Sequence, residues 1–259
     1  MSSIRVAYKY ILHFFLARNT KGYGVHSPFM FLFVRFILNE KHPFYIFDKI
    51  ESNRNLLLSN NETVKVVDFG TGLDRVATVK SIAKKSCISK KHGELLFRMV
   101  HYYQPSVVLE LGTSFGVSTS YLAASSSNID CYSLEGSPEI SHIASQNILN
   151  NGLKNIKTIV GNIDTTLPNL LESIHQLDFV FIDANHTSVA LLHYFELCLS
   201  KITHDTVIVI DDIYWSRDME FGWDCVKKHK EVSSTIDLYQ FGVVFFNKKI
   251  SKKHYIARI

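Results

Sequence analysis

The sequence predicts an α/β fold, in which a doubly wound, mostly parallel sheet of seven strands ends in an antiparallel hairpin. From about residue 105 onward, short apolar strands alternate with helical segments. Strands separated by helices pair in parallel through right-handed crossovers. Near the end of the chain, two strand-like segments are joined only through Gln240 and Phe241, which is typical of a hairpin. A helical N-terminal segment is expected before this α/β part.

The individual elements follow from local residue patterns, in chain order. The aromatic-rich stretches 3–18 and 28–39 predict two helices, and Ser27 with Pro28 suits the start of the second. Runs of β-branched and other apolar residues predict strands at 107–111, 129–134, 156–160, 178–182, 206–210, 234–239 and 242–246. Helices are predicted between them at 117–124, 138–149, 167–174, 186–199 and 214–229.

Changes in residue composition and pattern along the chain predict four parts. Residues 1–60 form an aromatic-rich helical segment that acts as a lid or a packing arm, and residues 61–104 a connecting region with a leading helix. Residues 105–247 form the α/β domain, and residues 248–259 a basic tail.

Composition excludes several classes of protein. The chain has 259 residues, of which 46% are hydrophobic and 20% charged, so it is globular rather than disordered. Its formal net charge of +4 gives no strong signal for nucleic-acid binding. Cys87, Cys131, Cys198 and Cys225 are far apart, which leaves zinc and redox motifs without support. No secretion signal or membrane-spanning run is visible, and we therefore expect a cytoplasmic protein.

Two glycine-containing segments compete as the ligand-binding loop. A nucleotide loop needs a strand, a glycine turn, a helix, and then a second strand that ends in a carboxylate. Residues 109–119 meet all of these conditions, because Gly112 and Gly116 follow a strand and Glu135 ends the next one. Residues 66–72 have no such acidic partner, so we interpret them as a turn near the site.

The chemistry of this loop favours one cofactor over another. The two glycines are four residues apart, whereas dinucleotide-binding loops use Gly-x-Gly-x-x-Gly. Glu110 also places an acid in the loop region, where it repels phosphate and attracts a cationic amino acid end. The loop therefore favours S-adenosylmethionine over NAD.

Five segments in this order resemble motifs of class I S-adenosylmethionine-dependent methyltransferases, most closely the catechol O-methyltransferase-like group. They are residues 108–118, 135–139, 160–164 with Pro168, 181–186 and 209–212. The resemblance implies a Rossmann-like methyltransferase fold, with residues 105–247 as the catalytic domain that binds the donor.

The resemblance also implies a set of donor-binding residues. Glu110, Gly112 and Ser118 correspond to positions at the methionine end, and Glu135 to the residue that binds the ribose. Asn162, Ile163 and Asp164 correspond to the border of the adenine. The full set that we expect to bind the donor is Glu110, Gly112, Thr113, Ser114, Gly116, Ser118, Glu135, Gly136, Asn162, Ile163, Asp164 and Asp183.

By the same resemblance, Asp183, Asp211 and Asp212 stand where the group binds Mg²⁺, and His186 stands where it has a lysine base. Asp212 departs from the asparagine of the group, but three carboxylates still suit Mg²⁺. Histidine is a chemically sensible base near neutral pH. We therefore expect His186 and Asp183 to be catalytic. The alternatives are that Asp212 only caps the next helix and that His186 only caps or packs at a helix start.

The predicted function is methylation of a hydroxyl group on a small molecule, with Mg²⁺ assistance left open. Tyr23, His26 and Phe29 are candidates to close over the acceptor. Trp215 and Trp223 are candidates to wall it, and the alternative for Trp223 is a place in the core. We expect no nucleic-acid partner, and a homo-oligomer is compatible with the sequence.

Two alternative functions remain. The first is methylation of nitrogen or of nucleic acid through the basic tail, but the base-methylating motif Asn/Asp-Pro-Pro-aromatic is absent at residues 183–186. The second is a non-catalytic cofactor-binding protein whose aromatic, basic N-terminus lies at a membrane surface.

Overall fold

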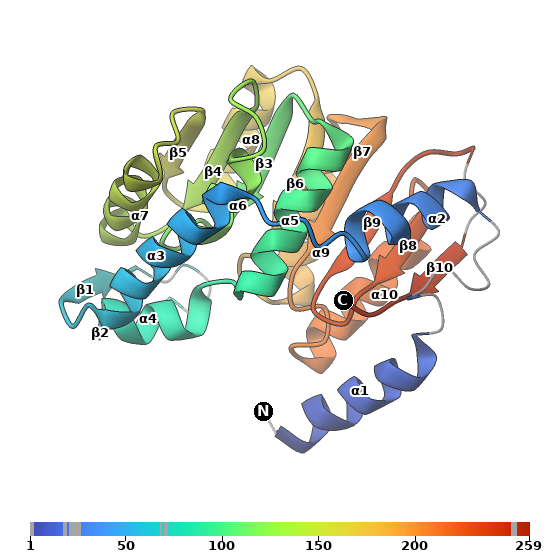
Figure 1. The fold of residues 1–259 in the computed structure, drawn as a ribbon, viewed down its shortest axis with the longest axis horizontal. Helices are drawn as coiled ribbons and strands as arrows, with labels where there is room; N and C mark the ends of the chain where they lie inside the picture. Colours follow the sequence, from blue (N-terminus) through green and yellow to red (C-terminus); the bar gives the residue numbers. More distant parts are fainter. Residues whose placement is uncertain (1–2, 18–19, 21–26, 68, 70–71, 250–252) are drawn as a thin grey trace. The chain divides into compact units, whose positions relative to one another are not determined.

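The computed structural model describes residues 3–17, 20, 27–67, 69, 72–249 and 253–259. The chain forms two compact units. Figure 1 labels its helices and strands. Unit 1 consists of residues 1–40 and 175–259, and unit 2 of residues 41–174. Tyr23 and His26, the two acceptor candidates in the N-terminal loop, lie outside the described residues.

Unit 2 contains three parallel strands, with β4 between β3 and β5. The strands are β3 (Val107–Leu111), β4 (Asp130–Glu135) and β5 (Ile156–Val160), and the helices that follow them are α6 (Val117–Ala123), α7 (Pro138–Asn151) and α8 (Ile163–Ser173). The strand–helix alternation predicted for this part is confirmed.

The part of unit 2 that precedes β3 contains a hairpin that was not predicted. Its elements are α3 (Tyr45–Ser59), β1 (Thr63–Val66), β2 (Arg75–Thr78), α4 (Val79–Ser86) and α5 (Lys90–Tyr103). Strands β1 and β2 pair antiparallel, so residues 67–74 connect the two strands of a hairpin.

Unit 1 contains five strands in the order β10–β8–β9–β7–β6. The strands are β6 (Leu177–Ile182), β7 (Ile202–Ile210), β8 (Ser234–Asp237), β9 (Gly242–Phe245) and β10 (Lys253–Ile256). Strands β6 and β7 are parallel, and β9 pairs antiparallel with both β7 and β8. The predicted antiparallel hairpin at the end of the domain is therefore confirmed, as is the mostly parallel α/β fold. Strand β10, which pairs parallel with β8, lies in the predicted basic tail and was not expected.

The helices of unit 1 differ from prediction mainly at their starts. They are α1 (Ser3–Leu16), α2 (Pro28–Phe33), the π-helix η1 (Val34–Leu38), α9 (Ser188–Leu199) and α10 (Arg217–Lys228). The side chains of Thr187 and Ser216 cap α9 and α10 by accepting hydrogen bonds from backbone N–H groups in the first turn. His186 and Asp212 therefore precede the helices, and the alternatives in which they act as helix caps are wrong.

Trp223 belongs to the core of unit 1. Its side chain is fully buried, and a Cβ atom added to Gly242 would come within 2.7 Å of its ring. This tight packing joins α10 to β9, so the glycine is required by the close approach of the indole. In the part of the chain that the structure describes, no helix has the length and apolar character needed to cross a bilayer.

Candidate functional site

The glycine loop of unit 2 connects β3 to α6 in a conformation that depends on its two glycines. Gly112 has φ +100° and Gly116 has φ +74°, values that favour glycine. The N–H groups of Gly112 and Thr113 both donate to the carbonyl of Leu134, at 3.0 and 3.2 Å. Asn147 on α7 donates its side-chain amide to Phe115 at 2.8 Å. The loop is thus fastened to both β4 and α7.

Glu110 lies fully buried at the base of this loop. The hydroxyls of Thr119 and Ser133 donate to its Oε2 atom, the latter at 2.5 Å. Burial raises the pKa of Glu110 to about 7, and the side chains of Ser118, Ser133 and Thr119 offset part of the increase. Its Oε1 atom is buried and meets no donor in hydrogen-bond geometry among the described residues. That oxygen is available to a ligand with a positive charge or an N–H group.

Glu135 ends β4 beside the glycine loop. Its carboxylate accepts hydrogen bonds from the backbone N–H groups of Ser114 at 2.8 Å and Ser137 at 2.9 Å. Burial raises the pKa of this carboxyl group, and the backbone donors act in the opposite direction. The structure therefore brings Glu135 together with Ser114 and Gly136, as the sequence predicts.

The β1–β2 hairpin is tied to the same two loops, which the sequence did not indicate. The N–H of Val67 donates to the Ser137 hydroxyl at 3.3 Å, and that hydroxyl donates to the Lys65 carbonyl at 3.2 Å. At the tip, Phe69 lies so close to Gly136 that an added Cβ would come within 2.8 Å of its ring. The expectation that residues 66–72 form a turn near the site agrees with these contacts, although Asp68, Gly70 and Thr71 lie outside the described residues.

Residues 162–164 follow β5 and open α8. Asn162 caps this helix, because its side chain accepts a hydrogen bond from the N–H of Asp164 at 3.0 Å. This cap starts the helix earlier than the predicted residue 167. Ile163 is buried and Asp164 is exposed. Gly161 is bonded through its N–H to the Glu135 carbonyl at 2.9 Å, so this segment lies next to the end of β4.

In unit 1, the ends of β6 and β7 bring four predicted residues together. Nε2 of His186 lies 3.6 Å from Oδ1 of Asp183, and Nδ1 lies 4.0 Å from Oδ2 of Asp212. Asp211 is buried and hydrogen-bonded to the Asp183 side chain. Trp215, which is half exposed, places its ring centroid 6.2 Å from that of His186. These residues form one cluster with an aromatic neighbour.

The protonation of this cluster is set mainly by burial. Burial first, and then the adjacent charge of Asp212, raise the pKa of Asp211 to about 7, against the opposing effect of its hydrogen bonds. Burial also raises the pKa of Asp212, against the influence of His186. The pKa of His186 is lowered by burial, and Asp212 partly opposes the change. The imidazole is therefore neutral near pH 7 and can accept a proton.

Gln240, which the sequence analysis did not single out, holds the two consecutive aspartates. Its Nε2 donates to Oδ1 of Asp211 at 2.9 Å and also to Oδ1 of Asp212. The N–H of Asp212 donates to the same Asp211 oxygen at 2.7 Å, and Asp212 has φ +54°. The position of Gln240 in the β8–β9 turn is the signal that could have suggested this role. Strand β9 pairs antiparallel with β7, so the turn before β9 lies at the end of β7 that Asp211 follows.

The described residues do not show the predicted Mg²⁺ site. Among the described residues, no group of three or more His, Cys, Asp or Glu side chains is placed to hold a metal ion. Oδ1 of Asp211 accepts hydrogen bonds from Gln240 and from the Asp212 N–H, and the Asp211 carboxyl group is also hydrogen-bonded to the Asp183 side chain. We therefore derive no chemical step through a metal.

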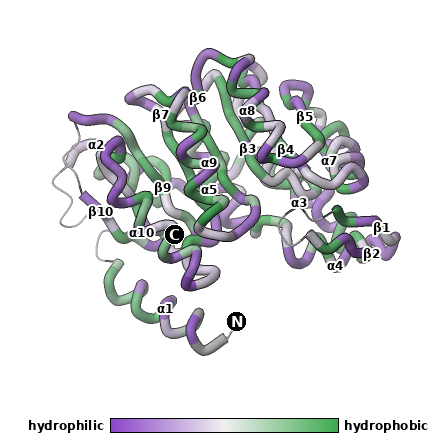
Figure 2. Tube along the Cα trace, turned by 180° about the vertical axis from the view of Figure 1, so that it is seen from behind, coloured by the Kyte–Doolittle hydropathy of each residue, from purple (hydrophilic) through white to green (hydrophobic). Residues whose placement is uncertain are grey.

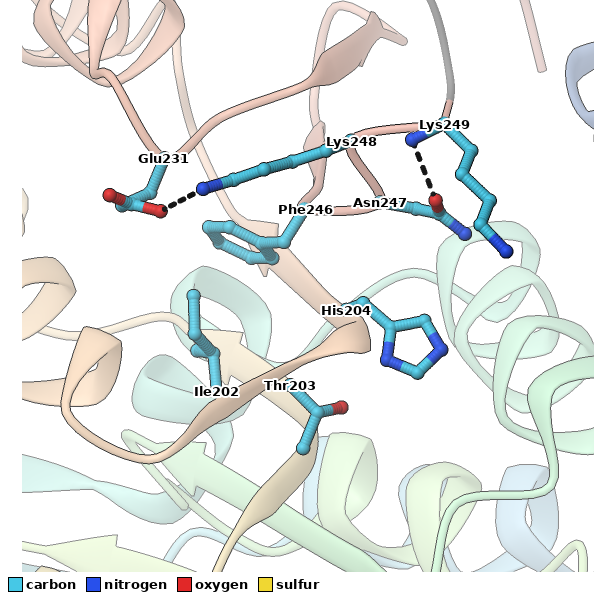
Figure 3. A pocket seen from close by; sticks show the side chains of 8 residues that line it. All are labelled: Ile202, Thr203, His204, Glu231, Phe246, Asn247, Lys248 and Lys249. Carbon is cyan, nitrogen blue, oxygen red and sulfur yellow. Dashed lines mark hydrogen bonds and ion pairs between the residues drawn. The ribbon is translucent and has the colours of Figure 1, made fainter.

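Unit 1 also contains a pocket, which Figure 3 shows from close by. It has a volume of about 610 Å³ and is lined by Ile202, Thr203, His204, Glu231, Phe246, Asn247, Lys248 and Lys249. Lys248 is paired with Glu231 at 3.2 Å. Because Ile202 begins β7 and Asp211 follows its end, this pocket is at the opposite end of the strand from the acidic cluster.

Comparison with known proteins identifies the same part of the chain. Residues 109–213 match a family model described as a methyltransferase domain. This segment contains nearly all the residues of the five motifs, and the match agrees with the resemblance of these motifs to methyltransferases.

Solved structures with the same fold include three methyltransferases. The O-methyltransferase from Bacillus cereus, in complex with SAH, is 20% identical with a TM-score of 0.57, over 82% of this chain and 95% of that one. The O-methyltransferase TomG from Streptomyces achromogenes, in complex with SAM, is 16% identical with a TM-score of 0.59, over 82% and 94%. The SAH-bound methyltransferase PaMTH1 from Podospora anserina is 14% identical with a TM-score of 0.56, over 81% and 99%. These likenesses confirm the fold.

Proposed function

We infer that this chain is a class I methyltransferase that uses S-adenosylmethionine, and we propose that it methylates a hydroxyl oxygen of a small molecule. The observation that carries the choice of acceptor is the position of His186 beside Asp183 and Asp212. Two of the structures with the same fold are O-methyltransferases bound to SAH or SAM. The four cysteines are free thiols, which agrees with a cytoplasmic location.

The residues of unit 2 suit the two ends of the donor. The unsatisfied Oε1 atom of Glu110 is a buried acceptor that matches the ammonium group of the methionine end. Glu135, held by two backbone N–H groups, can accept hydrogen bonds from the ribose hydroxyls. When bound, S-adenosylmethionine supplies a methyl carbon on a positively charged sulfur. Glu110 and Glu135 therefore bind and orient; neither takes part in the chemical step.

His186 supplies the group that a hydroxyl acceptor needs. The acceptor oxygen becomes a stronger nucleophile as its proton moves to a ring nitrogen of His186. The imidazole then becomes positively charged, and the neighbouring Asp183 and Asp212 carboxylates stabilise that charge.

The test is the variant His186→Ala. We expect the turnover number to fall on the order of 10²–10⁴-fold, because a positioned general base contributes about that much. Affinity for SAH, measured by calorimetry, should remain unchanged. His193→Ala is the matched control, since His193 is exposed on α9 and pairs only with the ring of Tyr194 among its aromatic neighbours.

The acceptor is sought in a panel of catechols, phenols, sugars and carboxylates. With the best acceptor, the acidic limb of the pH–rate profile should lie below the usual histidine value of 6.5, because burial lowers the pKa of His186. The rate measured with and without a chelator of divalent cations shows whether a metal ion assists the transfer. Near-normal turnover by His186→Ala would disprove the role of the histidine as base.

A further inference from the structure

Helix α1 has an apolar stripe that faces away from unit 1. Tyr8, Ile11, Leu12 and Phe15 recur at helical spacing, and their exposed fractions are 62%, 55%, 38% and 71%. Figure 2 shows the second half of α1 as mostly hydrophobic. We call these four residues the outer stripe. A contiguous exposed apolar patch of this kind marks a binding surface.

The polar residues of α1 face the protein instead. Arg5 and Lys9 both pair with Glu220 on α10. His13 is buried and its Nε2 lies 3.1 Å from Oδ1 of Asp237 at the end of β8. These contacts fix the orientation of the helix. Turning the outer stripe toward the protein would break the contacts of Arg5, Lys9 and His13. The stripe is thus held outward by ion pairs on the opposite side.

The charge of the chain is strongly divided by position. Residues 1–39 and 248–259 contain ten Lys and Arg and no Asp or Glu, so together they carry +10. The remaining residues, 40–247, contain 18 Lys and Arg against 24 Asp and Glu and carry −6, in agreement with the overall charge of +4. The small net charge of the chain is therefore the sum of two positively charged segments and a negatively charged remainder.

These two acid-free segments lie together in unit 1. The guanidinium of Arg258 lies 4.1 Å from the ring centroid of Phe14, and the Arg258 N–H donates to the Thr20 hydroxyl at 3.0 Å. Phe29 on α2 packs against Phe245 with ring centroids 4.9 Å apart. Arg35, Lys248, Lys249 and Lys253 are exposed cations within the two segments. The apolar stripe and a large positive charge therefore belong to the same unit.

We propose that α1 lies on the surface of an anionic lipid bilayer, with the outer stripe inserted at the boundary between headgroups and acyl chains. Helices that bind in this way combine an apolar face with nearby basic residues, and they lie in the plane of the interface. The negative surface of such a membrane attracts the cations of residues 1–39 and 248–259. A second copy of the chain is disfavoured as the occupant, because two segments of +10 would then face each other.

The test is sedimentation with lipid vesicles in the absence of any donor or acceptor. We expect the protein to sediment with vesicles of phosphatidylcholine and phosphatidylglycerol in about a 2:1 ratio, and not with phosphatidylcholine alone. Binding should weaken as salt is raised, because the headgroup charges are screened. Equal binding to both kinds of vesicle, or no binding to either, would overturn the proposal.

Two variants separate the outer stripe from other effects. Ile11→Glu combined with Phe15→Glu should lower the vesicle partition coefficient at least about tenfold, because the buried apolar surface is lost. Leu149→Glu, on an exposed apolar residue of α7 in unit 2, is the control and should bind vesicles like the unmodified protein. Unchanged far-UV circular dichroism spectra and melting temperatures in both variants verify that they are folded.

Light scattering tests the alternative that a second copy of the chain covers the outer stripe. If the unmodified protein is a dimer, the double variant is a monomer and neither binds vesicles, then a second copy covers the outer stripe and the proposal is wrong. A protein whose oligomeric state is the same in all three forms, together with loss of vesicle binding only in the double variant, supports the membrane surface.

Discussion

Glu110 is a fully buried carboxyl group whose hydrogen-bond partners contact one oxygen and leave the other unsatisfied. Its raised pKa of about 7 measures the cost of keeping an ionised group there without a cation. A ligand ammonium group would supply that cation. The ionised Glu110 therefore destabilises the protein without a ligand, and it attracts the ammonium group at the methionine end of the proposed donor.

The affinity for SAH should therefore depend on pH through Glu110. Below about pH 7 the carboxyl group becomes neutral and loses its attraction for the ligand ammonium, so binding weakens as the pH falls. Glu110→Gln should weaken binding at least about tenfold at neutral and higher pH, because a charge-assisted hydrogen bond is lost, and it should abolish the pH dependence. Calorimetric titrations on both sides of pH 7 measure both effects.

Stability distinguishes this loss of binding from a folding defect. The pKa of Glu110 in the folded protein lies above the usual value of 4.5, so the folded protein binds more protons than the unfolded chain between pH 4.5 and about 7. Stability from this group consequently falls as the pH rises through that window. Glu110→Gln removes the cost and should melt at a higher temperature than the unmodified protein above pH 7. A lower melting temperature would contradict this account of the residue.

At the scale of elements, the β1–β2 hairpin is joined to the loop that carries Glu135. Ser137 connects the two through its hydroxyl, and Glu139 accepts a hydrogen bond from the Lys65 N–H at 2.7 Å. Ser86, at the end of α4, reaches the glycine loop through a 2.7 Å contact with Ser114. The segment before β3 therefore supports both loops of the proposed donor site.

We expect Phe69 at the hairpin tip to cover the nucleoside of the proposed donor. Its ring packs on Gly136, beside Glu135, and half of its surface remains exposed. Phe69→Ala should weaken SAH binding roughly fivefold, the order expected for one aromatic contact. Val76→Ala, on an exposed residue of β2 in the same hairpin, should leave binding unchanged. If Phe69→Ala and the unmodified protein bind SAH with equal affinity, the ring of Phe69 does not contact the bound ligand.

These elements also show how far sequence reasoning reaches. The glycine loop and Glu135 were predictable, because a strand, a turn and a following acid are close in sequence and have a fixed geometry. The contact between Phe69 and Gly136 was not, because it depends on packing between segments that are far apart in the chain. For the same reason, the sequence could place Asp183, Asp211 and Asp212 at strand ends, but not show that Gln240 would hold two of them.

At the scale of the whole molecule, unit 1 is discontinuous and unit 2 is inserted between its two segments. The core of unit 1 joins these segments directly, since Phe29 and Phe33 both pack against Phe245. Forming that core closes a loop of about 130 residues, which has an entropic cost when the loop is unfolded. Once unit 2 is folded, the loop is far less free, so the stability of unit 1 depends on the folding of unit 2.

This dependence gives a measurable consequence, because the two tryptophans of the chain, Trp215 and Trp223, both lie in unit 1. All the predicted donor-binding residues except Asp183 lie in unit 2. SAH at about one hundred times its dissociation constant stabilises the folded state by about 2.7 kcal/mol, which corresponds to roughly 5–10 °C in a chain of this size. We expect tryptophan fluorescence to report that full shift, matching the shift seen by far-UV circular dichroism. Glu110→Gln should reduce both shifts equally. A tryptophan transition that stays in place while circular dichroism shows a separate, SAH-dependent transition would mean that the two units unfold independently.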